Sequence, residues 1–459
     1  RGRRALMGAF GGSSILDITA TIKLEGLISS VEIYRDQYGI PHVRAENLED
    51  AFFGQGFVTA QDRLWHMDYD RHRAYGRWAE LIGHEGLEQD LVMRRFRLEH
   101  SAKSDYRTVN HETRTMLESY ASGVNAFIDY SDRFPIEYKL LGCKPEPWQA
   151  WDGLAVFKVR HILMGTFEGK SWRVRLLNAL GAKQTARLHP GYQTGHLLII
   201  PPGEEYTGSV TDALEALEKG ATIIDRLKDL DQGSNHWTLS GTRTASGKPL
   251  LAGDPHRGLD TPNVYYQNHI TCPDFDVIGI SFPGVPGFPH FGHNQWVCWG
   301  VTHGMADYQD LYVEKFNPEH PDYYRFKGEW KQTEVYREII KVRGSSSTEI
   351  DVNVTHHGPI ISGDASSGFG VAFRYTQTFE ANRSAECLVK MLLAKSTFDL
   401  DESMRQWVDP VNNFLFSDVN GNIGYLTRGL LPVRSQANAW LPVPGWTGDH
   451  EWEGFIPFK

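Results

Sequence analysis

A Gly-Ser pair at residues 233–234 could generate a catalytic nucleophile by self-cleavage. A serine hydroxyl is a weak nucleophile unless a base activates it. If the bond between Gly233 and Ser234 is cut, the new α-amine of Ser234 can act as that base through a bridging water, because an α-amine has a reference pKa of about 7.7–8.0. Glycine allows the tight backbone bend that self-cleavage needs. Such a pair is also common in ordinary loops, so the residues around it must show whether it is a cleavage site.

Other catalytic signatures are absent from the sequence. It contains no G-x-S-x-G elbow, no H-E-x-x-H helix and no Walker loop, which removes several common hydrolase and nucleotide-binding classes. The four cysteines, Cys143, Cys272, Cys298 and Cys387, form no CxxC pair and are expected to be separate buried thiols. No organic cofactor is expected.

The composition indicates a large folded protein that does not bind nucleic acid. Hydrophobic residues make up 41% and aromatic residues 12% of the 459 residues, enough for an extensive core. The net charge of −10 disfavours a nucleic-acid partner, whose binding surface is usually basic. No apolar run approaches the ~20 residues of a membrane-spanning helix. The N-terminal stretch RGRRALMGAFGG begins like a signal peptide, but its apolar part is short, so the cellular location stays open.

The hydrophobic pattern changes from helical to β near Gly233. Two short strands are predicted in VEIYRD and IPHVRA, and Asn47 is a predicted N-cap. Apolar residues at helical spacing then predict helices over 47–80, 110–129 and 150–181, and 209–230 is a charged candidate spacer. Later strands are predicted in WTLSGTR, KPLLAGD, YYQNHIT, DVIGISF, TEIDVNVTHHGPI and GNIGYLTRG, with a helical region at 386–408. This order predicts an α+β fold with an antiparallel sheet and a helix-rich first half.

Three blocks resemble the penicillin acylase family of N-terminal-nucleophile hydrolases. They are IYRDQYGIPHVRAENLEDAFFGQGFVTAQDRLWHMDYDRHRAYGRWAELIG at 33–83, GSNHWTLSGTRTASGKPLLAGDPH at 233–256 and FPGVPGFPHFGHNQWVCWGVTHGMADYQDLY at 282–312. The first is similar to the start of the family's small α subunit and the second to the start of its large β subunit. The resemblance implies an αββα sandwich of antiparallel sheets. It also implies an α-subunit-like part at 24–205, a spacer at 206–233 and a β-subunit-like part at 234–459.

The resemblance also implies roles for particular residues. Ser234 matches the nucleophile, released by cleavage after Gly233. His256 matches a residue beside it and resembles the cephalosporin acylase and acyl-homoserine-lactone acylase branches; it would hold the α-amine toward the hydroxyl, whereas the alternative is a solvated turn residue. The backbone N–H of His303 matches one donor of the oxyanion hole.

Substrate binding is expected from Arg257 and from the segment between Met164 and Phe167. Arg257 is hypothesised to pair with a carboxylate or polar head at the mouth of an acyl pocket. A structural salt bridge from Arg257 to Asp254 or Asp260 is an equally open alternative.

A calcium site is a further implication of the resemblance. Asp307, the carbonyl of Gln309, and Asp310 match the family's calcium-binding stretch, and such oxygens suit a hard cation. The glutamate ligand of the family's α subunit has no clear counterpart, although Glu168 lies just before the matching segment KSWR. The alternative is a solvated acidic loop.

The predicted function is hydrolysis of a linear N-acyl amide through an acyl-enzyme on Ser234, in an α/β heterodimer cut from one precursor. The substrate is a small molecule, with penicillins, acyl-homoserine lactones and other N-acyl amines all allowed. The family's second oxyanion donor, an asparagine, is expected after Lys459, so turnover is expected of a longer, processed form. A catalytically silent ligand-binding homologue, or an incomplete fragment, is the alternative.

Overall fold

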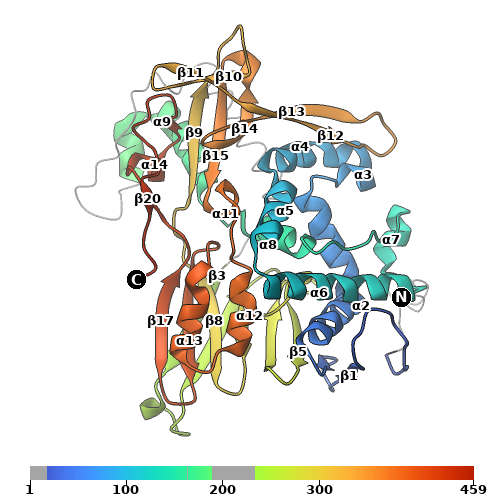
Figure 1. The fold of residues 1–459 in the computed structure, drawn as a ribbon. Helices are drawn as coiled ribbons and strands as arrows, with labels where there is room; N and C mark the ends of the chain where they lie inside the picture. The colour runs from blue at the N-terminus through green and yellow to red at the C-terminus, as the bar shows by residue number, and fades with distance from the viewer. Residues whose placement is uncertain (1–17, 163, 189–232) are drawn as a thin grey trace, which may run out of the picture.

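The computed structural model describes residues 18–162, 164–188 and 233–459. Figure 1 shows the first half of the chain as a group of helices and the second half as two sheets. The main helices are α2 (Leu48–Ala74), α3 (Ala79–Ile82), α4 (Leu87–Phe96), α5 (Leu98–Thr108), α6 (His111–Tyr130), α7 (Ile136–Leu141), α8 (Asp152–Ile162), α9 (Phe167–Leu188), α11 (Thr376–Phe379), α12 (Glu386–Leu393), α13 (Thr397–Ser403) and α14 (Ala437–Trp440). The predicted α+β class with a helix-rich first half is confirmed.

The larger sheet has eight strands. In spatial order they are β1 (Glu32–Arg35), β2 (Pro41–Arg44), β5 (Tyr266–Thr271), β6 (Asp276–Ser281), β7 (Phe291–His293), β8 (Val297–His303), β16 (Asn412–Asp418) and β17 (Ile423–Arg428). All neighbours are antiparallel except β2 and β5. The two strands predicted near the N-terminus therefore join the edge of a sheet built mainly by the second half of the chain.

A second sheet and three strand pairs complete the β structure. The six-stranded sheet has the order β12 (Glu334–Ile340), β13 (Thr348–Thr355), β14 (Gly358–Asp364), β15 (Phe369–Tyr375), β9 (Gln309–Lys315) and β19 (Val443–Pro444). The pairs are β3 (Gly233–Leu239) with β4 (Leu250–His256), β10 (Tyr323–Phe326) with β11 (Glu329–Gln332), and β18 (Pro432–Val433) with β20 (Gly454–Phe455).

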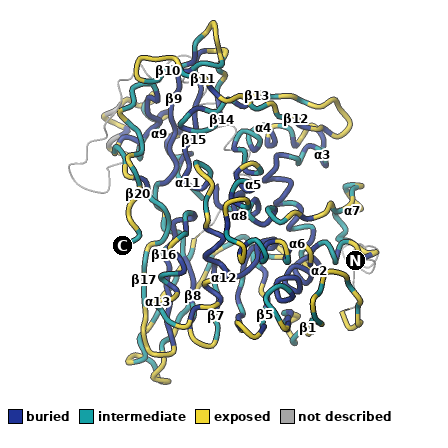
Figure 2. The backbone as a smooth tube through the Cα atoms, in the orientation of Figure 1, coloured by how far each residue is buried: buried dark blue, intermediate teal, exposed yellow. Residues whose placement is uncertain are grey.

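The residues of β8 alternate between the two faces of the larger sheet and show what covers each face. Trp299 and Val301 are buried in a core that this sheet shares with α2, α6 and α12. Gly300 faces the opposite side, where it lies under the β3–β4 hairpin. Helices, sheet and hairpin thus form three successive layers, and the buried residues follow the surfaces between helices and sheets (Figure 2). None of the helices within 18–162, 164–188 and 233–459 is long and apolar enough to cross a membrane.

The helix predicted over 150–181 is two helices. α8 ends at Ile162 and α9 begins at Phe167. Between them Gly165 lies so close to β9 that a Cβ atom there would come within 1.7 Å of Gln309 Oε1. A local periodicity cannot reveal this close approach, because it involves a strand far away in the sequence.

Other element boundaries differ in smaller ways. Asn47 caps α2 as predicted, accepting a hydrogen bond from the backbone N–H of Asp50 at 2.7 Å. The helix ends at Ala74 rather than residue 80, and Gly76 adopts a left-handed φ of 56°. TEIDVNVTHHGPI forms the hairpin β13–β14 instead of one strand, and 386–408 divides into α12 and α13. The amphipathic stretch 209–230 lies outside the described residues, as does the predicted spacer apart from Gly233.

Two glycines allow α2 and α6 to pack closely. These two helices belong to the core that they share with the larger sheet. A Cβ atom on Gly56 would lie 2.1 Å from the carbonyl oxygen of Tyr120, and one on Gly123 would lie 1.9 Å from that of Phe53. Both obstacles are backbone atoms, which cannot rotate away. The helices can therefore pack at this distance only with glycine at both positions.

We expect Gly123→Ala to lower the free energy of unfolding by about 1–3 kcal/mol, because the added methyl must push the helices apart. Chemical denaturation of the full-length protein measures the change. Gly169→Ala is the matched control: this helical glycine has only the Arg173 guanidinium near its Cβ position, at 3.6 Å, so alanine should be neutral or stabilising. Equal effects of the two substitutions would contradict the close packing of α2 on α6.

Candidate active site

The predicted nucleophile lies on the first strand of the β3–β4 hairpin. In this antiparallel pair Gly233 is opposite His256 and Ser234 is opposite Pro255. A Cβ atom on Gly233 would lie 2.8 Å from His256 Nδ1, so the imidazole is beside the Gly233–Ser234 bond. The other ring nitrogen, Nε2, lies 3.0 Å from Asp254 Oδ2 and 3.1 Å from Asn235 Nδ2. The structure thus brings His256 next to the cleavage point that the sequence predicts.

The face of β3 that carries Ser234 is turned toward the larger sheet. Ser234, His236 and Thr238 are half-buried, while the residues between them are exposed, as expected for alternating side chains. His236 fixes the contact, because a Cβ atom on Gly300 of β8 would lie 2.2 Å from His236 Cε1. From Gly300, β8 continues to His303, so the strand of the predicted nucleophile contacts the strand of the predicted oxyanion donor.

His303 is held at the end of β8 by the loop between α8 and α9. Its Nε2 lies 3.0 Å from the carbonyl oxygen of Met164. A carbonyl can only accept, so this nitrogen carries the proton and donates it. Burial lowers the pKa of His303, and the nearby charge of Arg257 adds to the effect although the bond to Met164 opposes it. A neutral His303 therefore positions the β8 terminus, and Met164 takes part through its backbone.

Arg257 forms no ion pair in the part of the chain that the structure describes. Its guanidinium lies over the ring of Tyr265, 5.7 Å from the centroid, and Nη2 is 3.4 Å from the Tyr265 hydroxyl. Neither Asp254 nor Asp260, the alternative partners considered from the sequence, lies within ion-pair distance of it. A half-buried cation without a carboxylate is a natural partner for an anionic or polar group of a ligand.

Two buried histidines next to Arg257 were not anticipated from the sequence. His161 of α8 and His290 lie with their ring centroids 5.9 Å apart and both contact Phe282. Burial lowers the pKa of His290 to about 3, and the charge of Arg257 contributes. Burial also lowers the pKa of His161 well below its ordinary value, helped by His290 and Arg257. The only sequence signal was a histidine inside the apolar block FPGVPGFPH.

Phe167 lies apart from these groups. Its ring is buried in a hydrophobic core between helices of the first half and the six-stranded sheet. It lies 6.0 Å from the ring of Phe96 and 5.2 Å from that of Phe373. These contacts support a packing role, because α9 uses this side chain to dock on β15. Of the segment predicted to bind substrate, Met164 is the residue that contacts the candidate site.

The predicted calcium ligands also lie together, but they surround a lysine. Asp307 Oδ1, the carbonyl oxygen of Gln309 and Asp310 Oδ1 lie 3.0, 2.6 and 2.7 Å from Lys170 Nζ. Burial alone would raise the pKa of Asp310, but Lys170 and Arg434 outweigh it and the pKa is lowered. The donor set would suit a hard cation, yet a side-chain cation already lies among its oxygens. As they stand, these residues do not fit a calcium ion.

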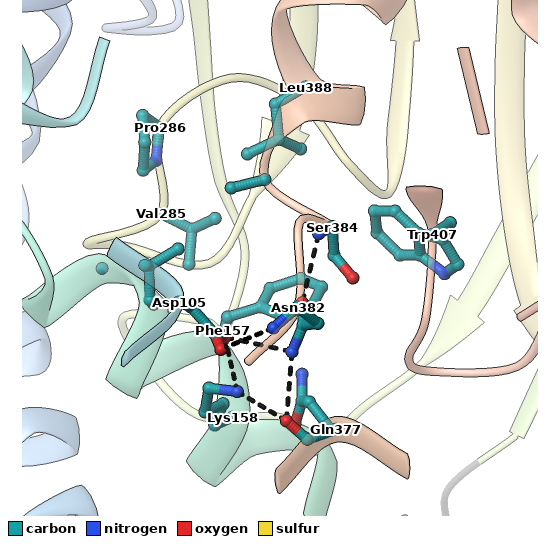
Figure 3. A pocket seen from close by; sticks show the side chains of 13 residues that line it. Asp105, Phe157, Lys158, Val285, Pro286, Gln377, Asn382, Ser384, Leu388 and Trp407 are labelled. Atoms are coloured by element: carbon teal, nitrogen blue, oxygen red, sulfur yellow. Dashed lines mark hydrogen bonds and ion pairs between the residues drawn. The ribbon is translucent and has the colours of Figure 1, made fainter. Parts of the chain in front are cut away.

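A separate small cavity lies behind the candidate site. Figure 3 shows Phe157 and Trp407 in its wall and the ion pair between Lys158 and Asp105, 2.7 Å long, at its polar end. The cavity has a volume of about 30 Å³, which is enough for about two water molecules and too small for an acyl chain. Phe157 separates it from His161, whose ring centroid is 4.2 Å away. None of the residues predicted to be catalytic lines it.

The chain is similar to penicillin acylases and acyl-homoserine lactone acylases. A family model described as penicillin amidase matches residues 30–459. The chain is 41% identical to penicillin acylase 2 proenzyme from Pseudomonas sp. (strain SE83), over 96% of this chain and 58% of that protein. It is 30% identical to the acyl-homoserine lactone acylase QuiP from Pseudomonas aeruginosa, over 94% of this chain and 53% of that protein.

A third relative is penicillin G acylase from Escherichia coli, 26% identical over 94% of this chain and 57% of that protein. The chain therefore spans about half the length of the curated relatives that it matches.

The buried imidazole of His290 should make the free energy of unfolding depend on pH. A folded-state pKa of about 3 against an ordinary 6.5 means that the unfolded chain takes up the proton first. Stability is therefore lost as pH falls below 6.5. Between pH 7 and pH 5 this single group should remove about 2 kcal/mol of the free energy of unfolding. We expect His290→Phe to reduce the measured loss over this range by about that amount.

Denaturant titrations at the two pH values measure this difference. Phe282→Leu is the control, since it changes the same cluster without removing a titratable group and should leave the pH dependence as it is. An unchanged loss in the His290→Phe protein would show that His290 is not held neutral.

Proposed function

The chain belongs to the penicillin amidase family, and we propose that the full-length protein hydrolyses a linear N-acyl amide with Ser234 as its nucleophile. The observation that carries the proposal is the position of the Gly233–Ser234 bond, beside His256 on a hairpin whose inner face lies on β8. In the uncut chain the nitrogen of Ser234 is a peptide nitrogen and cannot act as a base. Cleavage is therefore the first step.

Self-cleavage uses the serine hydroxyl. Ser234 Oγ attacks the carbonyl carbon of Gly233, the C–N bond breaks, and the released α-amine takes the hydroxyl proton. Water then hydrolyses the ester, which leaves a carboxylate on Gly233 and a free amino terminus on Ser234. Gly233 suits this step, because any side chain there would meet His256 Nδ1 at 2.8 Å.

Amide hydrolysis repeats the attack on an external substrate. The α-amine of Ser234 accepts the hydroxyl proton through a water molecule, Oγ bonds to the acyl carbon, and the leaving amine departs with a proton. The backbone N–H of His303 is the proposed donor to the oxyanion, and such a donor typically contributes about 10²–10³ in turnover. A second water releases the carboxylic acid. His256 is the proposed partner that orients the α-amine.

Arg257 is the proposed determinant of the acyl group. Its guanidinium lies against Tyr265. After burial itself, its charge contributes to the lowered pKa of His161, His290 and His303. An acyl chain that ends in a carboxylate or another polar acceptor would pair with it. The relatives are named for penicillins and for acyl-homoserine lactones. Both kinds of compound are N-acyl amides, and both are candidate substrates of this protein.

Ser234→Ala should abolish cleavage and hydrolysis together, because both steps use the same oxygen. Intact-mass analysis of the full-length protein should give two chains for the wild type, the second beginning at Ser234, and one uncut chain for the variant. Ser246→Ala, in the exposed turn of the same hairpin, is the control and should be cut normally. Cleavage of the Ser234→Ala protein at this bond would refute the assigned nucleophile.

Arg257→Leu should lower kcat/KM for an acyl amide with a terminal carboxylate about 10–100-fold more than for a neutral amide of equal length, since a hydrogen bond to a charged group contributes about 1.5–3 kcal/mol. Steady-state kinetics on the paired substrates measures the ratio. Arg257→Lys, which keeps the charge, should retain part of the preference. A preference ratio that is the same in wild type and Arg257→Leu would rule out this role.

A further inference from the structure

The cluster around Asp310 joins three parts of the chain that are distant in sequence. Lys170 comes from α9, Asp307 and Asp310 from the connection into β9 and its start, and Arg434 from the segment before α14. Lys170 and Asp310 are completely buried. We propose that Lys170 is a built-in cation of this protein, taking the place that a divalent metal ion would need among Asp307, Gln309 and Asp310.

The surroundings of Lys170 Nζ match the geometry of an ammonium group. An ammonium group has three N–H donors and no acceptor. Lys170 Nζ has three oxygens at 2.6–3.0 Å, one from each of Asp307, Gln309 and Asp310. These are hydrogen-bond distances, whereas calcium–oxygen distances are about 2.3–2.6 Å. Every donor of the lysine is satisfied, as a buried ammonium requires.

Protein donors already occupy the Asp310 carboxylate. Besides Lys170, Asp310 Oδ1 receives Arg434 Nη2 at 3.0 Å. Asp310 Oδ2 receives Arg434 Nε at 2.5 Å, Trp452 Nε1 at 2.7 Å and Asn438 Nδ2 at 3.2 Å. A carboxylate offers about four lone-pair positions, and five donors already point at this one. A metal ion would have to displace protein donors to bind here.

The charges within the cluster already balance. The two carboxylates of Asp307 and Asp310 carry two negative charges, and Lys170 and Arg434 supply two positive charges. Arg434 Nη2 also lies 2.9 Å from Asp307 Oδ2, so both cations contact both carboxylates. The cluster is neutral as it stands, and a divalent ion would leave two uncompensated positive charges in a buried site, which is costly.

Lys170 lies two residues after Glu168 on α9, and residues two apart on an α-helix point in different directions. Lys170 is fully buried, and its ammonium group contacts both Asp307 and Asp310. This helix therefore supplies a positive charge to the cluster, where the family resemblance implies a carboxylate.

The cluster also supports the candidate active site. Thr166 Oγ1 donates to Asp307 Oδ1 at 2.6 Å, and Gln309 Nε2 donates to the carbonyl of Ile162 at 3.1 Å. These bonds fix both ends of the connection whose Met164 carbonyl holds His303. Lys170 is therefore a positioning residue, and its role does not depend on whether the protein hydrolyses an amide.

Metal analysis and thermal melting of the full-length protein test the proposal. After passage through EDTA the wild type should hold far less than one equivalent of calcium, and its Tm should not change when millimolar calcium is added. Lys170→Met should lower the Tm by about 3–5 °C, because it leaves buried carboxylates under-compensated. Lys390→Met, at an exposed position on α12, is the matched control and should leave the Tm unchanged.

Lys170→Glu provides a gain of function. With three carboxylates and Arg434 the cluster would carry two net negative charges, which a divalent ion neutralises, so calcium should raise the Tm of this variant alone. One tightly held calcium per wild-type chain, or a wild-type Tm that rises with calcium, would overturn the proposal. If the Lys170 variants do not fold, the wild-type measurements still decide it.

Discussion

The candidate site depends on the contact between the imidazole of His236 and the bare backbone of Gly300. This contact seats the β3–β4 hairpin on the larger sheet, since any side chain at Gly300 would collide with His236 at 2.2 Å. Ser234 lies two residues before His236 on the same face of β3, and His303 lies three residues after Gly300 on β8. The proposed nucleophile and the proposed oxyanion donor are thus placed by two strands in van der Waals contact rather than by loops.

Positive charge and neutral imidazoles characterise the surroundings of this contact. Burial holds His161, His290 and His303 neutral, and Arg257 is the cation among them. Such an environment favours an anion or a polar acceptor and disfavours a second cation. Asp254 is the carboxylate beside His256, whereas Asp307 and Asp310 are neutralised by Lys170 and Arg434. The site therefore offers a stabilised place for developing negative charge, as acyl transfer requires.

The sequence predicted local features and missed those made by distant contacts. The N-cap at Asn47 follows from local chemistry and agrees with the structure. The strand predicted in WTLSGTR is shifted: β3 begins at Gly233 and ends at Leu239, and Gly241–Arg243 forms a 3-10 turn. The close approach at Gly165 and the Lys170 cluster involve β9, which is remote in sequence, so no periodicity contains them. The family resemblance located Asp307 and Asp310 but suggested a metal ion, because it identifies ligands without showing which charge already faces them. The roles of Ser234, His256 and His303 stay predictions that the geometry supports.

Covalent labelling can show whether Ser234 is the activated serine of this protein. The processed full-length protein would be treated with phenylmethylsulfonyl fluoride, which transfers its sulfonyl group to an activated serine oxygen and releases fluoride. Peptide mass spectrometry would then locate the adduct. The account predicts one label per molecule, on the peptide that begins with Ser234, in proportion to lost activity. Complete inactivation with an unmodified Ser234, or a label on another residue that tracks the loss, would contradict it.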